Sequence, residues 1–344
     1  MKPKVFVVQP IPDVALEVLR QAADVSVYPY MDRQISVDEL VANAKRSDWL
    51  FVVHETNVTA EVIYANPNLK GIGCMAGGHL YIDMDAANAR KIPVILEDPS
   101  ETFGGVSVTT CDLTMAMLLG LAYRLVDSDR YTRGGNFRQE QTMALMGIGC
   151  PGKTAGLIGL GKVALQMVPR LRAFDMQVIY TKRNRLPAER ESALGVEWVP
   201  ELHELIKRSD FLCILCNYSS STHKLIGKRE LGLMKKDAYL INTGRGRIID
   251  EPALIRALQE RQIAGAAFDV YWNEPYWKDP PDIGEAWVPE QLRKLDNVIL
   301  APHNGGATWD VRGAKALSVA RGIVKMMRGE TPAALHNPQI LASA

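Results

Sequence analysis

Residues 154–184 constrain the fold more than any other part of the chain. They open with an apolar run at 155–158, which predicts a short buried strand. Gly159, Gly161 and Ala164 follow with the spacing G-x-G-x-x-A. In such a pattern the first glycine permits a tight turn, the second lets the backbone approach a pyrophosphate, and the alanine allows a helix to pack closely on the strand.

A helix and a second strand are expected after these glycines. Leu165, Val168, Leu171 and Phe174 recur at helical spacing, and residues 177–180 form another apolar run. This strand–turn–helix–strand order is the context that a dinucleotide-binding fingerprint requires, and the N–H groups at the helix start would face the phosphates. A tight turn without a ligand is the alternative interpretation.

Composition narrows the class of protein. The 344 residues suffice for two domains, and a net charge of +1 gives no broad basic surface for nucleic acid. Pro10 and Pro12 break the first apolar run, unlike a secretory signal. The longest apolar run, around 113–122, is too short to span a bilayer. We therefore expect a cytoplasmic protein with no membrane or nucleic-acid partner.

The cysteines predict neither a disulfide framework nor a metal site. The chain has five, an odd number without framework spacing. Cys213 and Cys216 form C-x-x-C, but inside an apolar segment that predicts a buried strand, where cysteine behaves as a small hydrophobe.

Alternating strands and helices predict parallel sheets covered on both faces. Before the fingerprint, strands are expected at 4–9, 25–28, 49–53, 71–75 and 93–96, and helices at 14–22, 37–44, 59–65 and 84–90. After it, strands are expected at 211–215, 238–242, 265–270 and 298–301, and helices at 201–208, 251–260 and 312–328. Between the two parts, 106–125 predicts one long helix that is apolar on all sides, and 130–152 an irregular surface arm.

Three ionisable residues follow three of the expected strands. Arg245, Glu274 and His303 are separated by 29 residues each, one strand–helix–strand step. Ligands of open parallel sheets bind beyond the carboxyl ends of the strands. Alone, each residue has a structural interpretation as a loop cation, a solvated acid or a capping histidine. Together at one sheet edge they favour catalysis.

Several segments of the chain resemble the D-isomer-specific 2-hydroxyacid dehydrogenase family, whose typical members reduce glyoxylate and hydroxypyruvate. The resemblance covers nearly the whole chain and rests on GLIGLGKVA, MKKDAYLINTGRGRIID, FDVYWNEP, LAPHNGGATWDVR and AGGHLYIDMD. Three features depart from the family. Asp112 stands where Glu is usual, Cys216-Asn217-Tyr218 replaces a proline-containing loop, and residues 276–288 form a long stretch rich in Pro and Trp.

The resemblance implies two Rossmann-like α/β domains, each a doubly wound parallel sheet, with the active site in the cleft between them. The substrate-binding, flavodoxin-like domain would comprise residues 1–103 plus 316–344, and the dinucleotide-binding domain residues 104–315. The resemblance also implies a homodimer. The apolar helix from Val106 and the arm that follows it point the same way, because they carry more apolar surface than one core needs.

The reaction expected of such a protein is reduction of a 2-oxo acid to a D-2-hydroxy acid. A hydride would come from C4 of a reduced nicotinamide and a proton from His303, because imidazole titrates near neutral pH. Glu274 would bond the other ring nitrogen and favour the protonated form. Arg245 would pair with the substrate carboxylate.

Further site residues follow from the resemblance and from their place in the chain. Expected substrate contacts are Gly77, Gly78, His79, His54 and Trp309. Expected cofactor contacts are Gly159, Gly161, Lys162, Val163, Lys182, Arg183, Asn184, Cys216, Asn217, Thr243, Asp269, Gly305 and Gly306. Asp269 either holds the nicotinamide amide, as the resemblance implies, or is a structural acid that caps its loop.

Residues after the second fingerprint strand predict the cofactor. NAD sites place an acid about 20 residues past the glycines to bond the ribose 2′-OH. Lys182 stands 21 residues after Gly161, and no acid occurs before Glu189. Lys182 and Arg183 suit the 2′-phosphate instead, so NADP(H) is expected in preference to NAD(H), with NAD(H) still usable. The alternative is an ordinary solvated basic loop.

Competing functions stay open at this stage. The presence of Glu274 argues against a formate dehydrogenase, which lacks this acid, and the chain ends too early for the regulatory domain that many phosphoglycerate dehydrogenases carry. The motifs do not exclude phosphite oxidation. A nucleotide-sensing protein, like the family members that act as transcriptional corepressors, is disfavoured by the three ionisable residues but can retain them.

Overall fold

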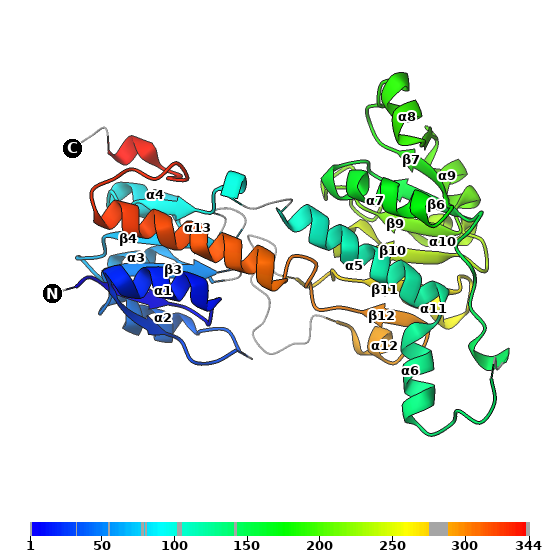
Figure 1. The fold of residues 1–344 in the computed structure, drawn as a ribbon, viewed down its shortest axis with the longest axis horizontal. Helices are drawn as coiled ribbons and strands as arrows, with labels where there is room; N and C mark the ends of the chain where they lie inside the picture. Colours follow the sequence, from blue (N-terminus) through cyan, green and yellow to red (C-terminus); the bar gives the residue numbers. More distant parts are fainter. Residues whose placement is uncertain are drawn as a thin grey trace. The chain divides into compact units, whose positions relative to one another are not determined.

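The chain divides into two compact units (Figure 1). The computed structural model describes residues 2–31, 33–53, 56–76, 79, 81–101, 105–140, 143–274 and 288–341. Among them, unit 1 comprises the residues up to Gly105 and from Thr308 onward, and unit 2 the residues from Val106 to Ala307. Three residues expected at the substrate, His54, Gly77 and Gly78, lie outside the described residues.

Unit 1 contains a five-stranded parallel sheet in the order β2-β1-β3-β4-β5. The strands are β1 (Lys4–Val7), β2 (Asp24–Val27), β3 (Trp49–Val53), β4 (Gly71–Met75) and β5 (Val94–Leu96). The helices are α1 (Asp13–Ala22), α2 (Val37–Ala44), α3 (Ala60–Tyr64), α4 (Met84–Ala89) and α13 (Trp309–Met327). This is the flavodoxin-like strand order.

The last long helix, α13, belongs to unit 1 although the chain reaches it last. It lies beside α1 (Figure 1) and also contacts β4. A Cβ atom at Gly73 would lie 2.7 Å from Val319 and 2.6 Å from Ile323 of this helix. Glycine at this point of β4 therefore lets the helix approach the sheet closely, and the apolar residues of both join one core.

Unit 2 contains a seven-stranded parallel sheet in the order β12-β11-β10-β9-β6-β7-β8. The strands are β6 (Thr154–Ile158), β7 (Gln177–Thr181), β8 (Glu197–Trp198), β9 (Phe211–Ile214), β10 (Tyr239–Asn242), β11 (Gly265–Phe268) and β12 (Val298–Leu300). The order changes direction between β6 and β9, so the fingerprint after β6 stands at the topological switch point.

Helices and apolar side chains cover both faces of this sheet. Neighbours along one strand, such as Leu240 and Ile241, belong to different core clusters, as alternation of side chains requires. The helices are α5 (Gly105–Ala122), α6 (Leu125–Arg133), α7 (Lys162–Ala173), α8 (Ala188–Leu194), α9 (Leu202–Arg208), α10 (Lys228–Leu233), α11 (Glu251–Gln259) and α12 (Glu290–Arg293). Short 3₁₀ turns lie at Pro99–Glu101, Met143–Leu145, Gly246–Ile248 and Pro338–Ile340. The fold class expected from the sequence, two parallel-sheet α/β domains, is confirmed.

The expected single helix over 106–125 is wrong in one respect. α5 ends at Ala122, and α6 begins at Leu125 after Arg124, whose φ of 49° breaks the helix. The side chain of Arg124 bonds Asp127 in the first turn of α6 and the carbonyl of Ala144 in the arm. The arm expected over 130–152 therefore begins inside a helix. No residue of α6 is buried, and most of its residues are polar or charged, a composition typical of a surface arm.

By length and a mean hydropathy of 1.5, α5 would also pass as a membrane span, but half of it is buried inside the protein. Core helices of soluble proteins have the same property.

Smaller differences have similar causes. Phe174 was expected on the apolar stripe of the fingerprint helix, but α7 ends at Ala173 and Phe174 is 41% exposed. The short elements α8, α10 and α12 bury one residue each and were not expected.

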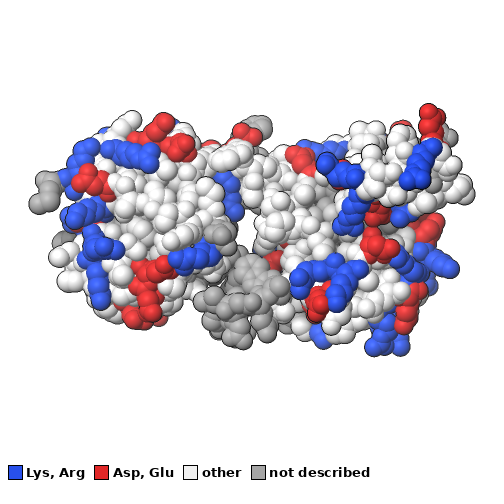
Figure 2. Space-filling view, turned by 90° about the horizontal axis from the view of Figure 1, so that it is seen from below, with Lys and Arg blue, Asp and Glu red and all other residues white. Residues whose placement is uncertain are grey.

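Charged side chains of both signs are interspersed over the face seen in Figure 2, in keeping with the net charge of +1.

Candidate active site

Four polar residues follow three neighbouring strands of unit 2. Arg245 follows β10, Asp269 and Glu274 follow β11, and His303 follows β12. Because the strands are parallel, their carboxyl ends meet at one edge of the sheet. The fold therefore brings together the three residues that their spacing singled out.

A hydrogen bond joins His303 to Glu274. The Nδ1 atom of His303 lies 2.9 Å from Oε2 of Glu274, whose Oε1 accepts the backbone N–H of Tyr271 at 2.8 Å. The glutamate side chain is 7% exposed and the histidine side chain 45%. With Nδ1 facing the carboxylate, Nε2 is the ring nitrogen left for a substrate.

The surroundings of His303 favour its protonated form. Its pKa is raised above the ordinary value, mainly by the hydrogen bond to Glu274 and against the opposing effect of burial. The negative charges of Glu274 and Asp269 add to the rise, and the positive charge of Arg245 reduces it. An imidazole that titrates above its usual range is suited to donate a proton near neutral pH.

Asp269 holds the loop that carries His303. Its two carboxylate oxygens accept the backbone N–H groups of Asn304 at 2.8 Å and Gly305 at 3.0 Å. A Cβ atom at Gly305 would lie 2.9 Å from Asp269 and 3.0 Å from Thr110, so a larger residue would disturb this contact. Burial raises the pKa of Asp269, and the two N–H groups oppose that rise. These bonds favour the loop-capping interpretation of this acid.

The backbone around Arg245 is fixed and its guanidinium is not buried. Asn242, itself fully buried, donates from Nδ2 to the carbonyl of Arg245 at 3.0 Å. A Cβ atom at Gly246 would lie 2.1 Å from the carbonyl carbon of Tyr271, so the two loops touch through their backbones. The guanidinium of Arg245 donates to the carbonyl of Gly244 at 2.6 Å and is otherwise exposed, so it can receive an anion.

The glycine loop after β6 has the geometry that a nucleotide needs. Gly159 has a φ of 94°, and a Cβ atom there would lie 2.9 Å from the backbone of Cys216. A Cβ atom at Gly161 would meet nothing within 4 Å, so this glycine borders open space. Gly161 caps α7 without a side-chain hydrogen bond, which leaves the first N–H groups of the helix available to phosphate oxygens. Ala164 is fully buried against the sheet.

The basic residues after β7 differ in what they contact. Arg185 is bound to Glu191 by two hydrogen bonds, at 3.0 and 2.7 Å, and its guanidinium lies 4.9 Å from the ring centre of Trp198. Arg183 is exposed and makes one long hydrogen bond, 3.4 Å, to the hydroxyl of Ser221. Lys182 is half-buried beside it. Arg185 is thus held by the fold, whereas Arg183 has only one long hydrogen bond to a protein group.

Comparison with known proteins decides the family. The profile described as "D-isomer specific 2-hydroxyacid dehydrogenase, NAD binding domain" matches residues 115–305. The glyoxylate reductase of Thermococcus gammatolerans is 35% identical over 99% of this chain and 98% of its own length. The chain belongs to the D-isomer-specific 2-hydroxyacid dehydrogenases.

Solved structures agree with this assignment. A Thermus thermophilus protein, TT0316, is 29% identical, with a TM-score of 0.79 over 97% of this chain and 99% of its own. The NADPH-dependent glyoxylate/hydroxypyruvate reductase of Sinorhizobium meliloti, crystallised with NADP and malonate, is 26% identical, with a TM-score of 0.68 over 95% and 94%. The protein is thus an NAD(P)-dependent oxidoreductase, and its similarity to glyoxylate reductases supports 2-oxo acid reduction.

The remaining expected cofactor residues of this dehydrogenase follow the carboxyl ends of strands in the unit 2 sheet or belong to the fingerprint. Lys162 is exposed and Val163 half-buried in the first turn of α7, and Asn184 is exposed after Arg183. Cys216 is half-buried, Asn217 is exposed, and Gly306 is half-buried. Burial raises the pKa of the Cys213 thiol to about 12 and that of Cys216 to about 11. Within the described ranges no cluster of His, Cys, Asp and Glu has the makings of a metal site.

Thr243, an expected cofactor residue, pairs with a buried threonine of α5 that was not expected at the site. The hydroxyls of Thr114 on α5 and Thr243 after β10 are 2.9 Å apart, and Thr114 also donates to the carbonyl of Thr110 at 2.6 Å. The contact between the two hydroxyls holds the middle of α5 against the loop that carries Arg245. Thr114, a polar residue inside the apolar run around 113–122, was the available signal.

In unit 1 of the dehydrogenase, two expected substrate residues are described. The imidazole of His79 stacks on that of His336, with ring centroids 4.1 Å apart. Trp309 begins α13 and is 83% exposed.

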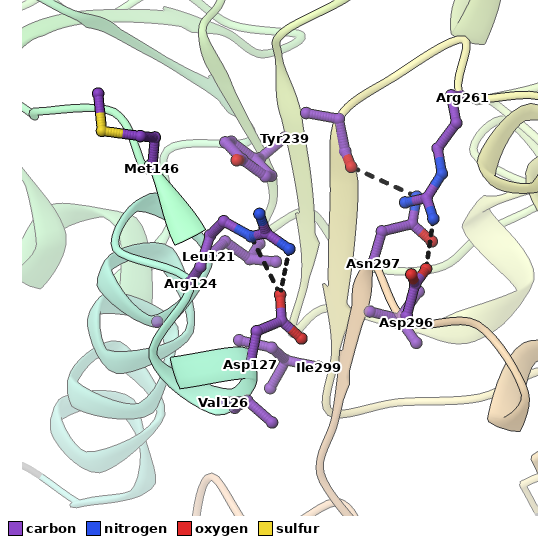
Figure 3. Close-up of a pocket in the computed structure, with 13 residues that line it drawn as sticks. Leu121, Arg124, Val126, Asp127, Met146, Tyr239, Arg261, Asp296, Asn297 and Ile299 are labelled. Carbon is purple, nitrogen blue, oxygen red and sulfur yellow. Dashed lines mark hydrogen bonds and ion pairs between the residues drawn. The ribbon is translucent and has the colours of Figure 1, made fainter. Parts of the chain in front are cut away.

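A separate pocket of about 390 Å³ lies at the opposite edge of the unit 2 sheet (Figure 3). Tyr239, Ala264 and Asn297 line it at the amino ends of β10, β11 and β12, whereas the catalytic candidates follow the carboxyl ends. Two internal ion pairs, Arg124–Asp127 and Arg261–Asp296, neutralise its charged lining. It is distinct from the candidate active site.

Proposed function

We propose that this protein reduces a 2-oxo acid of the glyoxylate or hydroxypyruvate kind to the D-2-hydroxy acid, with NADPH preferred and His303 as the proton donor. The hydrogen bond between His303 and Glu274 carries the proposal. It stands beside an exposed arginine, on a sheet whose switch point bears the dinucleotide fingerprint. Relatives named glyoxylate reductase over nearly the full length support the choice of substrate.

Each residue has one task in this reaction. Arg245 binds the substrate carboxylate through its exposed guanidinium and polarises the neighbouring carbonyl. Glu274 keeps His303 protonated and oriented, and His303 gives a proton from Nε2 to the carbonyl oxygen. A bound nicotinamide would supply the hydride for the carbonyl carbon. Hydride and proton together convert the 2-oxo acid to the 2-hydroxy acid.

The described residues fit a dinucleotide with a 2′-phosphate. The free N–H groups at the start of α7 and the open space at Gly161 suit the pyrophosphate. Lys182 and Arg183 would pair with the 2′-phosphate, Arg183 in a two-bond fork. Arg185 is held by two hydrogen bonds to Glu191, whereas Arg183 makes one long hydrogen bond to Ser221, which a phosphate oxygen could replace.

Two further expectations belong to the proposal. Gly77, Gly78, His79, His54 and Trp309 would contact the substrate from unit 1. The protein would be cytoplasmic, and it would act as a homodimer, for which the apolar α5 and the arm after it are the argument.

A spectrophotometric screen tests the proposal. Oxidation of NADPH and NADH is followed with glyoxylate, hydroxypyruvate and larger 2-oxo acids, and reduction of NAD⁺ and NADP⁺ with phosphite. We expect NADPH oxidation with glyoxylate or hydroxypyruvate. Turnover with phosphite alone would replace the proposal by phosphite oxidation, and cofactor binding without any turnover would favour a nucleotide-sensing protein.

A further inference from the structure

Two imidazoles stack on each other in unit 1. The rings of His79 and His336 have centroids 4.1 Å apart and planes inclined by 24°. His79 follows β4, in the segment proposed to contact the substrate. His336 comes from the C-terminal segment, after α13, and had no part in the sequence analysis.

The backbone of His336 is held firmly on the sheet. Its N–H donates to the carbonyl of Val94 at 2.8 Å, and Leu335 forms an antiparallel bridge with Ile95. The segment thus extends the sheet beyond the edge strand β5.

The next residue, Asn337, fastens the same segment. It is 1% exposed, accepts the N–H of Val94 at 2.9 Å, and donates to the carbonyl of Ile92 at 3.0 Å and to Asn88 at 2.9 Å. The ring of His336 is therefore carried by a backbone that several hydrogen bonds hold in place.

The backbone of His79 is bonded to Ile82, which is itself held by a neighbouring segment. Its carbonyl accepts the N–H of Ile82 at 2.9 Å, and Ile82 forms a parallel bridge with Val58. The side chain of His79 itself is partly exposed. A ring that rests on a rigid platform loses less freedom when a ligand binds than a ring that turns freely.

The surroundings of His336 favour the neutral form of its ring. Burial lowers the pKa of His336, and the positive charge of a protonated His79 lowers it further. A neutral His336 ring can face the His79 ring without the repulsion that two imidazolium rings would have.

We propose that His336 is a positioning residue for the 2-oxo acid: its ring holds the His79 imidazole in the orientation that binds substrate. This inference rests on the proposed function. It assigns His336 an effect on substrate affinity and none on hydride or proton transfer.

Three variants test the inference. His336→Ala removes the platform, His336→Phe keeps an aromatic face without a titrating group, and Gln339→Ala changes an exposed neighbour on the same segment. For each, kcat and KM for glyoxylate are measured at saturating NADPH, together with the NADPH dissociation constant by fluorescence and the melting temperature. The ring protons of His79 are followed by NMR, because a stacked ring shifts them upfield.

We expect His336→Ala to raise KM about three- to tenfold, the range that one aromatic contact contributes. Its kcat and NADPH affinity should stay within about twofold of the wild type. His336→Phe should restore most of the KM, Gln339→Ala should match the wild type, and the upfield shift of His79 should vanish only in His336→Ala.

Four results would overturn the inference. An unchanged KM in His336→Ala would remove the positioning role while the proposed function stood. A His336→Phe variant as impaired as His336→Ala would show that the stack is not the cause. An upfield shift of the His79 ring protons that persists without His336 would show that the two rings do not stack. A wild-type protein that reduces no 2-oxo acid would overturn the proposed function and this inference with it.

Discussion

His303 is bonded through Nδ1 to Oε2 of Glu274 at 2.9 Å, and the second oxygen of that glutamate is taken by the backbone of Tyr271. The carboxylate therefore cannot turn away from the imidazole without losing a buried hydrogen bond. This fixes the ring orientation and raises the His303 pKa, the two properties required of a proton donor.

Replacing Glu274 by Gln should shift the pH profile of reduction to lower pH. Reduction needs protonated His303, so the rate falls as pH rises through the His303 pKa. The glutamate raises that pKa, and the neutral amide would let it fall. The kcat/KM for glyoxylate measured across pH checks this prediction. A wild-type profile in the variant would show that Glu274 does not affect the pKa of His303.

Replacing Arg245 by Ala should raise KM for the 2-oxo acid roughly ten- to hundredfold, the range of a charged hydrogen bond, and lower kcat as well. Arg245→Lys keeps the charge without the planar fork and should recover only part of the loss. Steady-state kinetics with glyoxylate and NADPH distinguish these variants. An Arg245→Ala variant with a normal KM would place the carboxylate elsewhere.

The basic residues after β7 should determine the choice of cofactor. The wild type should use NADPH with a higher kcat/KM than NADH, and Lys182→Asp combined with Arg183→Ala should weaken or reverse that preference. Arg185→Ala is the matched control, because Arg185 is bound to Glu191 and should leave the ratio unchanged. A wild type that used NADH as well as NADPH, or better, would refute this account of the cluster.

The protein should be a homodimer that depends on the arm after α6. Large apolar side chains exposed around this part of the chain are Tyr123, Leu125, Phe137, Met143 and Met146. Light scattering at micromolar concentration should give twice the chain mass of 38.1 kDa.

Replacing Phe137 and Met143 by Ser should shift the homodimer toward the monomer. Met31→Ser, which changes an equally exposed methionine of unit 1, should not. A monomeric wild type would contradict the prediction.

The elements that the sequence predicted best are the ones that are buried. The expected strands at 49–53 and 71–75 coincide with β3 and β4, in which every residue is buried, so an apolar run and a strand have the same limits. α6 was not expected because its mostly polar sequence, with no buried residue, is also typical of a surface loop. The sequence pattern therefore predicts an element best where packing buries most of the residues of that element.

The candidate site could be predicted in part for a related reason. Arg245, Glu274 and His303 come after strands, so their meeting at one sheet edge follows from the parallel topology. The contact of Asp269 with Asn304 and Gly305, and the buried ion pair of Lys315 with Glu97 at 2.8 Å, join distant segments through geometry that no local pattern encodes. The same holds for the stack of His79 on His336.

The most direct test of the account is the rate of NADPH oxidation by His303→Ala at saturating glyoxylate, beside the wild type. His203→Ala serves as the control, since His203 forms a similar pair with Glu230 at 3.0 Å on α9 and α10. Loss of the proton donor should reduce kcat by roughly two to four orders of magnitude, with NADPH affinity and the control unchanged. A His303→Ala variant that oxidised NADPH at nearly the wild-type rate would contradict the central claim that His303 donates the proton.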